Sequence, residues 1–266
     1  MFSDLVHIEL IRLIRTRFFL AGIFTLLAAL FFMNITYPAS VSDAFLRRDL
    51  VETDASDTGV KIQVTMYMIN SGMITLFATV NVTFATCDYY KYREFINIRG
   101  SIRSRAKLCL SEISGILIQC LVLSLIPVLM SVFSRAYDEL SLITAYPFAT
   151  VILYLSYSWT LFNSCLVMYA VSKLLRRKSF ALAAEPVIFF CITMVTGYLS
   201  GFLAGRYGGQ GDELARALFV PSQNIAEQLL GNGRTGAALF SVAFAFLQTG
   251  VLCGVSILFG KRAEKI

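Results

Sequence analysis

Long stretches without charge constrain this chain more than any other feature. Apolar runs of about 18 residues or more are typical of helices that cross a bilayer. Six such runs cover residues 18–35, 62–87, 108–134, 146–172, 181–204 and 236–260. Only 15% of the 266 residues are charged, whereas a soluble domain has about 25%. The sequence therefore predicts an all-α membrane protein with six transmembrane helices in a single domain, residues 1–266.

The distribution of basic residues predicts the orientation. Of the 23 Lys and Arg residues, 16 fall in the N-terminal segment, in residues 88–107, in residues 173–178 and in the C-terminal tail. Cytoplasmic loops carry such an excess in multi-pass proteins. We therefore expect both termini and these two segments to be cytoplasmic, in a protein of the cell membrane. The net charge of +6 follows from this topology and does not indicate a nucleic-acid partner.

Two segments outside the spans have helical signals. Residues 1–17 resemble an amphipathic elbow helix on the membrane surface, although a basic flank of the first span is an alternative. Its predicted apolar face holds Val6, Leu10, Leu13 and Ile14, and its predicted polar face holds Glu9, Arg12, Arg15 and Thr16. In residues 206–235, caps at Asp212 and Ser222 and a stop at Pro221 predict an outer helical hairpin.

Polar residues inside the spans have local interpretations. Glu185-Pro186 suits a helix N-terminus, and we favour that role over a proton relay. Glu112 lies near the basic interface, where it is expected to pair or snorkel. Four amides are expected to form hydrogen bonds between helices; they are Asn81, Gln119, Asn163 and Gln248.

The residues needed for catalysis are missing from the sequence. The single histidine, His7, excludes a site with several histidine ligands to zinc and leaves no Ser/His dyad elsewhere. The tail GVSILFGKR has five residues between Gly254 and Gly260, where a phosphate-binding loop has four. We therefore expect no enzyme activity, no metal site and no cofactor on this chain.

Glycines at four-residue spacing predict close helix packing. They are Gly197, Gly201 and Gly205 in the fifth run, and Gly250 and Gly254 in the sixth. Without side chains, such a face lets two backbones approach closely. The contact could lie within one chain or between two subunits.

The segment between the second and third runs, residues 88–107, combines six basic residues with several aromatic ones. Tyr92, Phe95 and Ile98 recur at three-residue spacing and form a plausible docking face on a helix. The basic residues that could bind lipid headgroups or acidic groups of a partner protein are Arg99, Arg103, Arg105 and Lys107. A basic loop with interfacial tyrosines is the simpler alternative.

The stretch YREFINIRGSIRSRAKLCLSEI, within this arrangement of spans, resembles the permease subunits of ABC-2-type ATP-binding cassette transporters. The similarity is to small bacterial members that export peptides, bacteriocins or antibiotics. It implies that residues 88–107 carry a coupling helix that docks into an ATPase subunit through Tyr92, Arg93, Phe95, Ile98, Arg99 and Arg103. Some relatives fuse the ATPase domain to the permease, but this chain has no nucleotide-binding domain.

The resemblance therefore implies a separate ATPase polypeptide that binds ATP and Mg²⁺. It also implies a second permease, either another copy of this chain or a sister subunit. The alternative is a secondary transporter or a channel-like protein without an ATPase, a class that usually shows intramembrane charges or internal repeats. A membrane enzyme is the weakest interpretation because no catalytic set is present.

Overall fold

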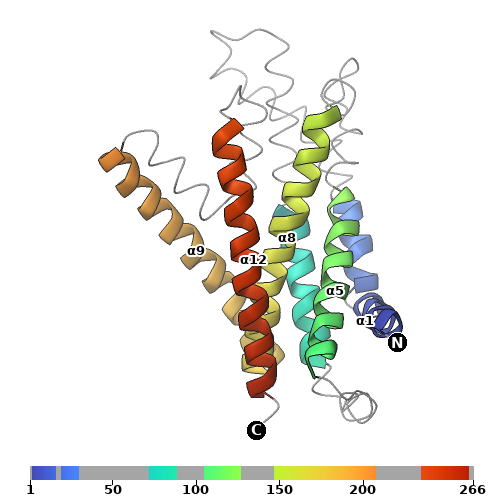
Figure 1. Cartoon of the computed structure of the whole chain (residues 1–266). Helices are drawn as coiled ribbons and strands as arrows, with labels where there is room; N and C mark the ends of the chain where they lie inside the picture. Colours follow the sequence, from blue (N-terminus) through green and yellow to red (C-terminus); the bar gives the residue numbers. More distant parts are fainter. Residues whose placement is uncertain are drawn as a thin grey trace.

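The computed structural model describes residues 2–15, 19–29, 72–88, 105–126, 147–207 and 235–263, and nearly all of them are helical (Figure 1). No strand occurs in these ranges. The labelled helices are α1 (Phe2–Arg15), α5 (Arg105–Leu123), α8 (Pro147–Leu175), α9 (Lys178–Tyr207) and α12 (Thr235–Ala263). Two further helices cover residues 19–29 and 72–88.

Each of the six predicted apolar runs overlaps one of these helices, so the all-helical prediction is confirmed for the part that the structure describes. Among the residues searched, α9 is the one helix both long and apolar enough to cross a membrane. Its 30 residues extend for about 45 Å, which exceeds a hydrocarbon core of about 30 Å. Phe19–Ala29 and Ala243–Leu258 are shorter apolar helices. Six spans therefore stay a prediction.

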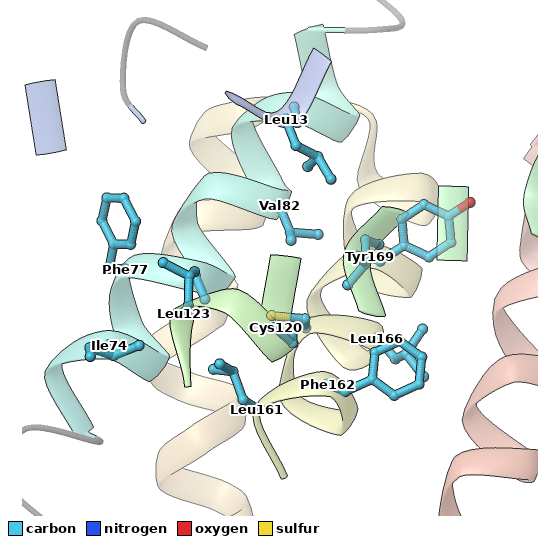
Figure 2. Close-up of a cluster of buried hydrophobic side chains, with 14 of the residues drawn as sticks. Leu13, Ile74, Phe77, Val82, Cys120, Leu123, Leu161, Phe162, Leu166 and Tyr169 are labelled. Atoms are coloured by element: carbon cyan, nitrogen blue, oxygen red, sulfur yellow. The ribbon is translucent and has the colours of Figure 1, made fainter. Parts of the chain in front are cut away.

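The core lies where helix 72–88, α5 and α8 meet. Figure 2 shows side chains from all three helices converging there, together with Leu13 of α1. The core includes Ile74, Phe77 and Val82 of helix 72–88, Cys120 and Leu123 of α5, and Leu161, Phe162, Leu166 and Tyr169 of α8. Because lipid tails are as apolar as these side chains, close van der Waals packing, rather than escape from water, holds such helices together in a bilayer.

Helix α8 is central, because it packs against α5, α9 and α12. Its contact with α12 is partly polar. Asn163 Nδ2 donates to Gln248 Oε1 at 3.4 Å, and Thr249 Oγ1 donates to Asn163 Oδ1 at 2.7 Å. Asn81 Nδ2 likewise donates to the Leu13 carbonyl at 3.3 Å. The predicted hydrogen bonds between helices are thus confirmed for these three amides, whereas Gln119 has no partner among the described residues.

Helix α1 lies across the direction of the other helices and is seen nearly along its axis in Figure 1. It packs against α5, where Gly115 permits the close approach. A Cβ added at Gly115 would lie only 3.2 Å from the Cβ of Glu9. The predicted faces of this helix hold for Leu13, which is buried, but were wrong for Glu9, which is buried beside it, and for Ile14, which is exposed. Glu9 precedes Leu13 by one turn, so the two residues share a face.

A two-residue turn, Arg176 and Arg177, joins α8 to α9. Arg176 has a φ of 56°, and its N–H donates to the Ser172 carbonyl at 2.9 Å. This is the left-handed conformation that commonly ends a helix, and glycine usually occupies it. Arginine at this position carries a conformational strain that a glycine would avoid.

Helix α9 begins at Lys178, seven residues before Glu185. Pro186 therefore lies inside the helix, and the prediction that Glu185-Pro186 marks a helix N-terminus was wrong. Beyond this point α9 diverges from the bundle (Figure 1). Its large side chains are then mostly exposed, as Phe190 at 61% and Tyr198 at 76% illustrate.

Candidate functional site

The predicted coupling residues Tyr92, Arg93, Phe95, Ile98, Arg99 and Arg103 lie outside the described residues, as does most of the predicted outer hairpin. The structure does describe both ends of the coupling segment, at Asp88 and Arg105. The end of helix 72–88, the start of α5 and the α8–α9 turn lie at the same end of the bundle (Figure 1).

The predicted glycine face is on the surface of the described part of the chain. Gly197, Gly201, Gly205, Gly250 and Gly254 are all exposed. A Cβ added at any of them would meet nothing within 4 Å. The described helices therefore make no close packing contact there, and a contact between two subunits stays a prediction.

The structure brings together a buried ionic group that joins α5 to α8. Lys173 Nζ of α8 lies 2.7 Å from Glu112 Oε2 of α5, and the two side chains are only 2% and 1% exposed. Tyr169, one turn before Lys173, donates its hydroxyl proton to the same carboxylate oxygen. The ammonium group also lies 5.0 Å from the centre of the Tyr169 ring. Pairing of Glu112, which the sequence predicted, is confirmed.

Helix α1 adds a second pair of charges. Arg12 Nη2 lies 2.8 Å from Glu9 Oε2, and Arg12 also acts electrostatically on Glu112. We call Glu9, Arg12, Glu112, Tyr169 and Lys173 the Glu112 cluster. Its two carboxylates and two basic groups balance, as buried charges must if their desolvation is to be offset. The cluster therefore joins α5 to α8 through the Glu112–Lys173 pair, and the charges of α1 lie near enough to act on Glu112.

A more exposed ion pair lies near the α8–α9 turn. Lys178 Nζ of α9 is 2.6 Å from Asp88 Oδ1, and these side chains are 34% and 29% exposed. The same ammonium group lies 4.4 Å from the centre of the Phe84 ring. Water screens such a pair, so its contribution to stability is about 0–1 kcal/mol.

The two ion pairs involve the helices that come before and after the predicted coupling segment in the sequence. Asp88, where helix 72–88 ends, binds Lys178, while Glu112, two turns into α5, binds Lys173. The two lysines lie on either side of the α8–α9 turn.

Sequence reasoning missed Glu9 and Lys173 as members of a cluster. Lys173 entered the prediction only as one of the charges that set the topology. Its position four residues after Tyr169, on one helix face, was the available signal. The partner on α5 is 61 residues away, and only packing brings the two together.

The described residues contain no group of three or more His, Cys, Asp or Glu side chains placed to hold a metal ion. No protein-family model matches the sequence, and a search of curated proteins found no significant relative.

Proposed function

We propose that this chain is the transmembrane permease subunit of an ABC-2-type ATP-driven exporter, with ATP and Mg²⁺ bound by a separate ATPase polypeptide. In this proposal the chain crosses the cell membrane six times and has both termini in the cytoplasm. Two permeases, either identical or a pair of sister subunits, form the path for a hydrophobic or amphipathic cargo such as a peptide, bacteriocin or antibiotic.

The observation that carries the proposal is a pair of ionic contacts on the helices that flank residues 89–104. A segment that passes force from an ATPase into membrane helices needs firm attachment where it joins them. The buried Glu112–Lys173 pair attaches α5, the helix after the segment, to α8. The weaker Asp88–Lys178 pair links the end of helix 72–88, before the segment, to the start of α9. The all-helical architecture and the crosswise α1 are also consistent with an elbow helix followed by membrane spans (Figure 1).

The docking face of the segment provides the test. Phe95→Asp together with Ile98→Asp places two charges on the predicted apolar face and should abolish co-purification of the ATPase from native membranes. Asn97→Asp is the matched control, since it adds a charge to the same segment on the opposite side of a helix. The control should retain the ATPase. Equal recovery of the ATPase with both variants would contradict the proposal.

One observation favours the alternative of a secondary transporter. Glu185 is an acidic residue inside α9 that is only 3% exposed, and intramembrane acidic residues often mark ion pathways. Purified protein in liposomes distinguishes the two functions. The exporter requires the ATPase and ATP, whereas a secondary transporter would move its cargo with an ion gradient alone.

A further inference from the structure

Glu185 is the sole acidic residue of α9 and lies about two turns from its start. Its side chain is 3% exposed, and its carboxyl group contacts the hydroxyl of Thr79 on helix 72–88. The ion pairs among the described residues are Glu9–Arg12, Glu112–Lys173 and Asp88–Lys178, so none of them includes Glu185. A carboxylate buried without a cation would be costly in free energy.

The hydrogen bonds of Thr79 bear on the protonation state of Glu185. Thr79 Oγ1 lies 2.8 Å from the Thr75 carbonyl oxygen and 3.0 Å from the Leu76 carbonyl oxygen, and it also contacts Glu185 Oε1. A threonine hydroxyl has one proton to donate. Within a helix that proton normally goes to a carbonyl of the preceding turn.

A proton on Glu185 gives the contact with Thr79 a donor of its own. When the Thr79 hydroxyl donates to the preceding turn, a carboxylic acid at Glu185 can donate to Thr79 Oγ1. A carboxylate would instead depend on the single hydroxyl proton of Thr79, with no cation among the described residues to offset its burial.

Two further polar groups lie within one turn of this contact along their helices. Thr83 follows Thr79 by one turn, has no exposed surface, and its hydroxyl has no partner among the described residues. Pro186 lacks an N–H, so the carbonyl of Leu182 loses its usual helical donor. Along these two helices, the polar groups next to the contact are therefore uncharged oxygen atoms and not positive charges.

We propose that Glu185 is an intramembrane proton-binding site, in which the carboxylic acid donates to Thr79 and holds the start of α9 against helix 72–88. Loss of the proton to water would leave a carboxylate that faces the oxygen atoms of Thr79. Two polar contacts join α9 to helix 72–88, the Glu185–Thr79 contact and the Asp88–Lys178 pair. The Asp88–Lys178 pair would then remain. The site rests on the proposed membrane crossing of α9 but not on the ATPase or the cargo.

Other charged groups on the surrounding helices are already engaged. Helix 72–88 contributes Asp88 and α9 contributes Lys178, and these two pair with each other. At the end of α8, Lys173 pairs with Glu112, and the Arg177 guanidinium lies 5.9 Å from the centre of the Phe180 ring. Arg176 belongs to the α8–α9 turn.

Infrared difference spectroscopy of the purified full chain in lipid nanodiscs tests the proposal. At neutral pH we expect a carboxylic-acid C=O band that Glu185→Gln removes. Thr79→Val should shift this band, because the acid loses its hydrogen-bond acceptor. Asp88→Asn is the matched control and should leave the band in place, since Asp88 is a partly exposed carboxylate paired with Lys178.

A difference spectrum between the wild type and Glu185→Gln that contains only carboxylate bands at neutral pH would overturn the proposal. If Glu185→Gln does not fold, Thr79→Val decides alone. A shifted acid band supports the site, and an unshifted spectrum contradicts it. Neither readout requires the ATPase or the cargo, so failure here is distinguishable from failure of the exporter function.

Discussion

Replacement of Lys173 by Met is the most direct perturbation of the Glu112 cluster. Lys173→Met keeps most of the volume of the side chain but leaves Glu112 buried, with Tyr169 as its remaining partner from α8. Removal of one member of a buried ion pair typically costs about 3–5 kcal/mol. Since about 1.4 kcal/mol corresponds to a factor of ten, the ratio of folded to unfolded protein should fall at least a hundredfold.

The assay is unfolding of the purified chain in mixed micelles, followed by helical circular dichroism. Lys178→Met is the matched control, because it makes the same replacement in a pair whose side chains are 34% and 29% exposed. That variant should lose at most about 1 kcal/mol. The double variant Glu112→Gln with Lys173→Met removes both charges and keeps an acceptor for Tyr169, so much of the stability should return. If Lys173→Met and Lys178→Met lower the free energy of unfolding equally, burial does not determine how much the Glu112–Lys173 pair stabilises the fold.

Two further predictions concern the α8–α9 turn and the glycine face. Arg176→Gly should be more stable than Arg176→Ala by about 1 kcal/mol in the same unfolding assay, because both remove the charge but only glycine relieves the left-handed backbone at φ 56°; equal stabilities would contradict this. Gly201→Leu should leave the folding of the single chain intact, since a Cβ there meets nothing within 4 Å, but it should abolish pairing of permeases, measured by native mass spectrometry. Retained pairing would mean that the glycine spacing is incidental.

The presence of the helices could be predicted from the sequence, because uncharged runs of this length have few other stable structures in a membrane. Their boundaries were harder to predict. The residues KSFALAA extend α9 back to Lys178, so Pro186 does not mark its start. The proline is tolerated near the start of a long helix, where it removes one hydrogen bond.

The contacts of the candidate site could not be predicted, because they depend on how the helices are packed. Glu112 showed its tendency to pair in the sequence, but its partner Lys173 is distant in the chain. Glu9 was assigned to the polar face of α1, yet the close approach at Gly115 draws it into the interior. Buried charges that satisfy one another across three helices leave no periodic pattern in a single sequence.

In the proposed exporter, the Glu112 cluster transmits movement between the coupling segment and the membrane helices. ATP hydrolysis by the complex of permease and ATPase in nanodiscs tests this role, with the Glu112→Gln, Lys173→Met double variant compared with the wild type. We predict that the double variant assembles with the ATPase, because Phe95 and Ile98 are unchanged, but no longer stimulates ATP hydrolysis. Assembly with stimulation equal to that of the wild type would contradict the proposed role of the cluster.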